Sequence, residues 1–220
     1  MKSNAAAPSK GKAAFELKHR LVQALNKIAD RDTYQIGLSE LDRAVDALCP
    51  DTVGPFLSCV ADTDADQKSA VRKECVRAVG ALAARSPALL APHMPKVVAT
   101  VVRRLRDADS VVRDACVDAC GALSACARSY GDGGAAAALV ALVRPLFESL
   151  GEQNRYVQAG AALCLAKVID ESSYFPGPVL PQMLGRVVKI LRNPHFMAKP
   201  AVIELIRSIV QVPLLLFQQF

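Results

Sequence analysis

The sequence of 220 residues contains no tryptophan and only three histidines, and aromatic residues make up 5% of it. Alanine, valine and leucine dominate the apolar 52%, and this composition favours closely packed helices over strands. No apolar run reaches the ~18 residues that a transmembrane helix needs, so no membrane partner is predicted. The first residues lack the long apolar core of a secretory signal, and we therefore expect a cytoplasmic protein.

The sequence also lacks the short motifs that commonly carry catalysis. It contains no G-x-x-x-x-G-K-[ST] phosphate loop, no G-x-G-x-x-G, no G-x-S-x-G and no H-E-x-x-H. The glycine-containing segment "YGDGGAAAA" (130–138) follows no strand, so it does not indicate a phosphate cradle. The scattered histidines and apolar-flanked cysteines form no nucleophile–base pair. We therefore predict that the protein is not an enzyme and binds no cofactor.

The seven cysteines are odd in number and include no C-x-x-C pair, which argues against a disulfide framework. Four of them sit on or beside apolar stripes and are predicted to be reduced and buried: Cys75, Cys116, Cys120 and Cys164. The spacing of Cys116 and Cys120 would place both on one helix face, which raises the alternative of a metal site. Such a site needs further ligands at short spacings, and the histidines lie far away in the sequence. No metal site is predicted.

Positive charge is in excess, with a net charge of +6, but it is unevenly placed. Residues 1–20 hold five Lys/Arg and one acidic residue, whereas the other 200 residues hold 22 Lys/Arg and 20 Asp/Glu. We expect residues 1–14 to form a disordered basic tail, which either contacts an acidic partner or only aids solubility. A nucleic-acid scaffold is disfavoured because the body is nearly neutral and lacks aromatic platforms.

The body contains an internal repeat. The segment "AVRKECVRAVGAL" (70–82) returns 41 residues later as "VVRDACVDACGAL" (111–123). The second copy has the apolar spacing of an amphipathic helix, and the segment before it, "PKVVATVVRRLRDAD", has the same spacing and ends in a short polar turn. The repeated unit is therefore a helix, a tight turn and a second helix. The recurrence of Gly80 as Gly121 predicts that helices approach closely there.

Five such pairs can be drawn along the chain, at about 15–49, 51–85, 88–129, 135–171 and 176–211. A helical repeat with a period of 41–45 residues is typical of HEAT and armadillo proteins. One amphipathic pair cannot bury its apolar stripe alone, but stacked copies can. We therefore predict an all-α fold, a HEAT-repeat α-solenoid over residues 15–211, in which helices 67–85 and 109–129 share a layer.

In a stacked array the turns within the pairs lie along one edge, where polar residues from distant parts of the sequence gather. These candidate partner-binding residues are Arg31, Thr33, Lys68, Lys73, Asn154, Arg155, His195 and Lys199. Each exposed ion pair would contribute only ~0.2–1 kcal/mol, but several together would orient an acidic protein partner and speed its association. The alternative interpretation is that these cations are solvated helix ends.

Two arginines recur within the repeat and suggest a structural role. Arg72 and Arg113 each follow a valine and lie six residues after an aspartate, Asp66 and Asp107 respectively. Repeated Asp/Arg pairs predict a ladder between neighbouring repeats, and contact with a partner is the alternative. The run "RRLR" (103–106) ends a helix, where the helix dipole favours positive charge.

The last nine residues, "VPLLLFQQF" (212–220), resemble no repeat and form an atypical apolar tail. Pro213 is expected to end the final helix, because proline lacks the N–H group and clashes with the preceding turn. The stripe of Val202, Leu205, Ile206 and Ile209 is then expected to be only partly covered by the tail. An exposed apolar patch at this uncapped end would favour self-association.

Five stretches carry a resemblance to a known family: "LNKIADRDTYQIGLSEL" (25–41), "SCVADTDADQKSAVRKECVRAVG" (58–80), "DADSVVRDAC" (107–116), "QNRYVQAGAALCLAKVID" (153–170) and "HFMAKPAVIELIRSI" (195–209). They resemble the N-terminal HEAT-repeat region of the plant TORTIFOLIA/SPIRAL-type microtubule-associated proteins. The resemblance implies a TOG-like array that binds tubulin or microtubules in the cytoplasm. It also implies a role in organising cortical microtubules and in the direction of organ growth.

The competing interpretation is a HEAT-repeat adaptor that scaffolds other proteins. Binding through the row of turns should be lost when the turn cations are reversed in charge, whereas binding through a groove should not.

Overall fold

The computed structural model describes residues 10–63, 67–172, 179–194 and 196–217. The regular elements among these residues are all helices, and the described residues contain no strand. In chain order the helices are α1 (Lys10–Ala29), α2 (Tyr34–Asp46), α3 (Val53–Ala61), α4 (Ser69–Arg85), α5 (Pro87–Leu90), the 3-10 helix η1 (Ala91–His93), α6 (Met94–Arg104), α7 (Ser110–Arg128), α8 (Gly131–Ser149), α9 (Arg155–Glu171), α10 (Val179–Arg192) and α11 (Lys199–Phe217).

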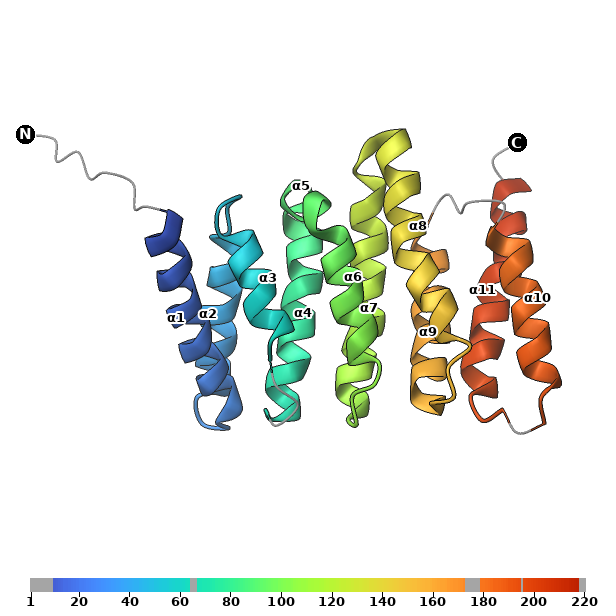
Figure 1. Ribbon diagram of the computed structural model, residues 1–220, viewed down its shortest axis with the longest axis horizontal. Helices are drawn as coiled ribbons and strands as arrows, with labels where there is room; N and C mark the ends of the chain where they lie inside the picture. Colours follow the sequence, from blue (N-terminus) through green and yellow to red (C-terminus); the bar gives the residue numbers. More distant parts are fainter. Residues whose placement is uncertain (1–9, 64–66, 173–178, 195, 218–220) are drawn as a thin grey trace, which may run out of the picture.

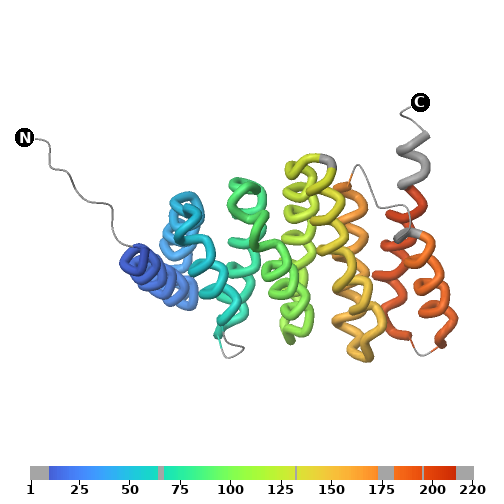
Figure 2. Tube along the Cα trace, turned by 45° about the horizontal axis from the view of Figure 1, so that its top comes forward, coloured from blue at the N-terminus to red at the C-terminus, as the bar shows by residue number. Residues whose placement is uncertain are grey.

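The ten longer helices form five antiparallel pairs that stack side by side in two layers (Figure 1). The first layer contains α1, α3, α6, α8 and α10, and the second contains α2, α4, α7, α9 and α11. Contacts between α4 and α7, between α7 and α9, and between α9 and α11 join the second layer. The tube in Figure 2 shows the chain progressing from one end of the array to the other. The α-solenoid is confirmed, and so is the shared layer of α4 and α7.

The repeated stripe forms the core between the layers. Val71, Cys75 and Leu82 of α4 are buried, and so are their counterparts in α7, Val112, Cys116 and Leu123. Burying each such side chain fully stabilises the fold by roughly 1.5–3 kcal/mol before entropy is counted. The stack therefore buries stripes that a single pair would leave in water.

The glycines of the repeat have different surroundings. A methyl group placed on Gly80 would lie 3.4 Å from Ala119 Cα, so α4 and α7 do approach closely at this glycine. On Gly121 it would lie 2.9 Å from Lys167 Cε, which belongs to a flexible side chain of α9. Close helix approach is thus confirmed at Gly80, whereas Gly121 faces a side chain.

The four cysteines predicted to be buried are buried and free. Burial raises the pKa of Cys75 to about 11, and burial together with the neighbouring Cys120 raises the pKa of Cys116. A hydrogen bond with Cys120 and complete burial raise the pKa of Cys164. Within the described ranges, no three His, Cys, Asp or Glu side chains are grouped so as to hold a metal ion. Nor does any helix described here have the length and apolar character needed to cross a membrane.

The two ends of the array differ from the sequence-based expectation. Helix α1 begins at Lys10, so a disordered tail over 1–14 is wrong for residues 10–14, and residues 1–9 lie outside the described part. Alanine and lysine favour helix there, and Lys10 forms a 2.9 Å ion pair with Asp51. At the other end, α11 continues through Pro213 to Phe217. Proline is also accommodated inside α8, at Pro145.

The expectation that the α11 stripe is only partly covered is also wrong at three of its four positions. Val202, Leu205 and Ile209 are buried, because α11 packs against both α9 and α10. The large apolar side chains that α11 exposes are instead Ile203 and Val210. The side chains of 212–220 lie outside the described residues, so covering of the stripe by the tail stays a prediction.

Candidate functional site

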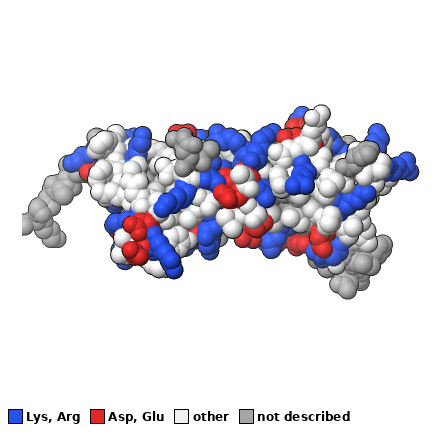
Figure 3. Space-filling model, turned by 90° about the horizontal axis from the view of Figure 1, so that it is seen from below, with Lys and Arg blue, Asp and Glu red and all other residues white. Residues whose placement is uncertain are grey.

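The turns within the five pairs lie along one side of the array, the lower side in Figure 1. We call this surface the turn edge and define it by residues 30–33, 62–63, 67–68, 105–109, 150–154, 193–194 and 196–198, together with the first turn of each second-layer helix. Figure 3 looks onto this edge and shows basic side chains along its length, with acidic side chains between them. The sequence prediction that the turns share an edge therefore agrees with the fold.

The first rung of the predicted ladder is present as an ion pair between neighbouring repeats. Arg72 donates hydrogen bonds from Nε to Asp107 Oδ2 at 2.7 Å and from Nη2 to Asp107 Oδ1 at 2.8 Å, which is a bidentate ion pair between repeats. The same Nη2 contacts Asp109 Oδ2 at 2.6 Å. Burial alone would raise the pKa of Asp107, but hydrogen bonds from Arg72 and from the Asp109 N–H lower it overall. Asp66 lies outside the described residues.

The second rung uses an aromatic ring in place of a carboxylate. Arg113 donates from Nη1 to the carbonyls of Asp107 and Ala108, at 2.6 and 2.7 Å. Its guanidinium lies 4.5 Å from the ring centroid of Tyr156 in the next repeat. The repeat-equivalent acid, Glu152, pairs with Arg106 at 2.6 Å instead. Arg113 therefore joins two repeats, but not through an ion pair.

Three of the predicted partner-binding residues make internal contacts. Thr33 Oγ1 donates to the Lys27 carbonyl at 2.9 Å, and Lys68 Nζ donates to the Ala29 carbonyl at 2.6 Å. Both satisfy carbonyls at the end of α1. Lys73 Nζ lies 2.9 Å from Glu74 Oε1 and 3.3 Å from the Tyr34 hydroxyl. The hydrogen bond that Lys73 donates to Glu74 is the main reason why the pKa of Lys73 is raised.

The other predicted residues divide into a cap and exposed cations. Asn154 Oδ1 accepts hydrogen bonds from the N–H groups of Tyr156 and Val157, at 2.9 and 3.4 Å, and so caps α9. Arg31, Arg155 and Lys199 are exposed, each at or beside the start of a second-layer helix. His195 lies outside the described residues.

Sequence reasoning missed an apolar component of the turn edge. Val111, Tyr156 and Met197 have exposed fractions of 47%, 44% and 67%. Each directly precedes a buried residue of the repeat, Val112, Val157 or Ala198, so the three occupy one repeat-equivalent position. Aligning the repeats would have placed the three residues at one position. In the sequence, however, an exposed apolar residue near a helix start cannot be told from a residue of the buried apolar stripe.

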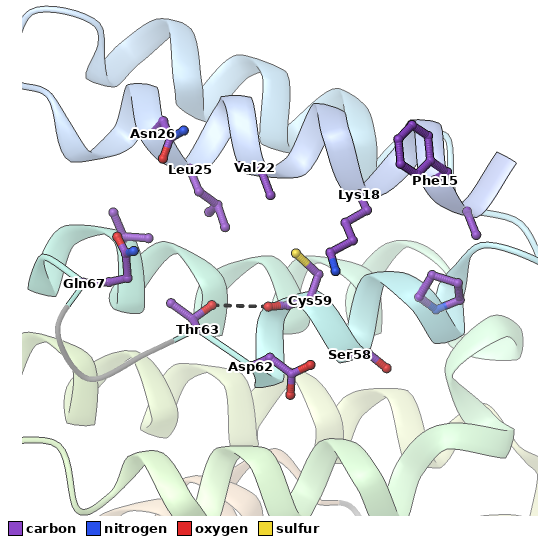
Figure 4. Close-up of a pocket in the computed structure, with 13 residues that line it drawn as sticks. Phe15, Lys18, Val22, Leu25, Asn26, Ser58, Cys59, Asp62, Thr63 and Gln67 are labelled. Carbon is purple, nitrogen blue, oxygen red and sulfur yellow. Dashed lines mark hydrogen bonds between the residues drawn. The ribbon is translucent and has the colours of Figure 1, made fainter. Parts of the chain in front are cut away.

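A cleft of about 530 Å³ lies between α1 and α3 and reaches the turn edge at Asp62, Thr63 and Gln67 (Figure 4). Phe15, Lys18 and Val22 line it from α1, and Cys59 and Thr63 line it from the opposite wall. Burial raises the pKa of the Cys59 thiol, and no histidine is among the lining residues. This arrangement supplies apolar contact surface and no activated nucleophile.

Comparisons with known proteins identify the sequence family. A family model described as TORTIFOLIA1 N-terminal matches residues 15–219. TORTIFOLIA1-like protein 2 of Arabidopsis thaliana is 57% identical over 196 residues, which are 89% of this chain and 24% of the relative. Microtubule-associated protein TORTIFOLIA1 of Arabidopsis thaliana is 37% identical over 215 residues, 96% of this chain and 25% of the relative. The chain thus spans about a quarter of the length of these relatives.

Among solved structures, the crystal structure of an engineered protein has a TM-score of 0.47 at 16% identity and covers 94% of both chains. A designed armadillo repeat protein in complex with the peptide (KR)4 has a TM-score of 0.38 at 16% identity, over 88% of this chain and 99% of that one. The family match over residues 15–219 is the decisive finding, and by it the chain belongs to the TORTIFOLIA1 N-terminal family.

Proposed function

We propose that this chain binds tubulin or microtubules, and that the turn edge is its binding surface. The observation that carries the proposal is the 37% identity, across 96% of the chain, to a relative named a microtubule-associated protein. The exposed cations on the turn edge support the choice of surface, because they come from three separate repeats and face the same way. An acidic protein surface is the partner that complements them.

The wider role is part of the same proposal. In the cell, this chain would act at the cytoskeleton in the cytoplasm, where it would organise cortical microtubules and so influence the direction of organ growth. The support is the family membership of residues 15–219.

The experiment is co-sedimentation with stabilised microtubules, run beside gel filtration with free tubulin. The structure selects Arg31, Arg155 and Lys199 for combined replacement by Glu, since Lys68 and Lys73 are engaged inside the fold. We expect the affinity to fall about ten-fold or more at low salt, because several exposed charges set long-range attraction together. The helical circular dichroism signal should stay unchanged.

A matched control reverses three exposed arginines away from the turn edge: Arg20, Arg128 and Arg144. It changes the net charge by the same amount and should leave binding nearly intact. Equal loss in both variants would show only a net-charge effect. Binding that survives the turn-edge variant would move the site, either to the N-terminal lysines, which deletion of residues 1–9 combined with Lys10→Gln and Lys12→Gln would test, or to a groove such as the cleft in Figure 4. The latter outcome would favour the adaptor function.

A further inference from the structure

A stacked group of three side chains lies in the middle of the turn edge. The Tyr156 ring has the Arg113 guanidinium 4.5 Å from its centroid and the Arg155 guanidinium at 4.7 Å. Arg155 Nη2 also donates to the Tyr156 hydroxyl at 2.8 Å. Cations at such distances are attracted to an aromatic face. Tyr156 therefore holds two positive groups from neighbouring repeats beside each other.

Both arginines of this group differ from Arg72 and Arg106, which also lie at the turns between neighbouring repeats. Arg72 is neutralised by Asp107 and Asp109, and Arg106 by Glu152. Neither Arg113 nor Arg155 has a carboxylate within ion-pair distance among the residues that the structure describes. Their internal partners are neutral carbonyl, hydroxyl and ring groups, so their positive charge is held in place without being compensated.

An apolar row accompanies the two cations. Val111 and Met197, the repeat-equivalent neighbours of Tyr156, are exposed on the turns before and after it. Protein interfaces commonly combine an aromatic or apolar centre with arginine, and tyrosine and arginine are over-represented among the residues that dominate binding energy. Around Tyr156 the turn edge has this composition.

We propose that Arg113, Tyr156 and Arg155 form a carboxylate clamp, which binds adjacent acidic side chains of a protein partner while Val111 and Met197 contact its apolar surface. The inference rests on the proposed function, for which it names the central contact. Guanidinium groups bind carboxylates with paired, charge-assisted hydrogen bonds. The ring limits the freedom of both guanidiniums before binding, so less entropy is lost when they bind.

The test uses the full chain with two probes, stabilised microtubules and a fluorescently labelled oligoglutamate peptide. Tyr156→Ala should weaken binding of both probes about five- to ten-fold, and Arg155→Gln should do the same, as expected for a cation–π-supported contact. Tyr156→Phe keeps the ring and should retain most of the affinity. Val140→Ala, at a similarly exposed apolar position on α8, is the matched control and should have no effect.

The outcomes separate this inference from the proposed function. Wild-type chain that binds oligoglutamate but does not sediment with microtubules would leave the clamp standing and overturn the proposed function. If the wild type sediments with microtubules and Tyr156→Ala sediments equally well, the proposed function stands and the clamp is wrong. If duplex DNA binds more tightly than oligoglutamate and is equally sensitive to Tyr156→Ala, the clamp is a phosphate site and its assignment to carboxylates is wrong.

Discussion

Arg72 shows how a single side chain can join two repeats. Its exposed fraction is 6%, and its guanidinium spans from α4 to the turn between α6 and α7. A buried ion pair of this kind stabilises little relative to apolar residues of the same size, but loss of one partner leaves an uncompensated buried charge. The pair therefore fixes how the repeats sit against each other.

Asp107→Asn should lower the free energy of unfolding by about 1–3 kcal/mol at pH 7, because a charge-assisted hydrogen bond becomes a neutral one. The pKa of Asp107 is lower in the fold than its ordinary value. Its ionised form therefore stabilises the fold above the unfolded-chain value of ~4, and this contribution is lost as the pH falls through the lower folded value. The variant and the wild type should converge in acid.

Urea unfolding, followed by circular dichroism at pH 7 and in acid, measures the difference in free energy of unfolding between the variant and the wild type. Asp42→Asn is the control, since Asp42 forms an exposed pair with Arg85 and should contribute less than ~1 kcal/mol. A constant gap between wild type and Asp107→Asn down to strongly acidic pH would contradict the prediction.

Thiol labelling should divide the cysteines by burial and pKa. Cys49 is exposed, and hydrogen bonds from the Thr52 hydroxyl and the backbone lower its pKa. The buried Cys75 has a pKa of about 11. Because the thiolate is the reactive form, Cys49 should react first at pH 7–8, and Cys49→Ser should remove the fast phase. Mass spectrometry of partly labelled protein locates the label, and fast labelling of Cys75 would contradict the burial.

At the residue scale, the sequence predicted that Arg72 and Asp107 belong to a ladder, because the same residue types recur at the same spacing in both repeats. It could not assign the partner of Arg113. Glu152 occupies the equivalent position but bonds to Arg106, and Tyr156 takes its place. Which of two neighbouring cations a carboxylate meets depends on side-chain reach across the stack, and a period of 41–45 residues contains no information on that.

At the scale of helices, glycine has two different roles. Gly37 of α2 lies directly against α1, where a methyl group placed on it would be 2.7 Å from the Ala24 carbonyl oxygen and 2.8 Å from the Ile28 nitrogen. Backbone atoms cannot move aside as a side-chain end can. The crossing of α1 and α2 therefore depends on the absence of a side chain at residue 37.

Gly37→Ala should destabilise the fold by about 1–3 kcal/mol or more, because the overlap forces the two helices apart. Gly80→Ala should be nearly neutral or slightly stabilising. Its methyl group would make an ordinary 3.4 Å contact with Ala119 Cα, and alanine is better than glycine in a helix by ~1 kcal/mol. Melting temperatures of both variants measure this contrast. A large loss in Gly80→Ala would show that α4 and α7 leave no room there.

The pairing of the helices could be predicted because apolar spacing and polar turns mark every pair. The ends could not. Proline commonly ends a helix, yet α11 continues beyond Pro213. Local propensity disfavours proline inside a helix, but packing of the preceding turns against α9 and α10 supplies energy that the local sequence does not reveal.

At the scale of the whole molecule, the last described pair of helices exposes four large apolar side chains. They are Leu184 and Val188 on α10 and Ile203 and Val210 on α11. On α11 they alternate with Glu204 and Arg207, and Arg207 pairs with Asp170. The exposed surface is therefore less apolar than the patch expected from the sequence.

Self-association through this end should accordingly be weak and dependent on concentration. Ile203→Glu combined with Val210→Glu should shift the chain toward the monomer, because two charges would be buried in any contact there. Sedimentation velocity over a range of concentrations measures the effect, with Val140→Glu on α8 as the control. Association that persists in the double variant would place the contact elsewhere.

Because the two layers run in opposite directions, the helix dipoles make one side of the turn edge more positive than the other. Second-layer helices begin at this edge, so the partial positive charge of their N-terminal ends is presented there (Figure 1). The described first turns of α4, α9 and α11 contain no acidic residue that would offset it, whereas first-layer helices α1, α6 and α10 end there with basic residues. The main chain itself is therefore electropositive along one side of the edge. Replacing Arg155 and Lys199 with Gln would remove their formal charges but leave this main-chain field, so a residual attraction for anions would persist, weakening with added salt.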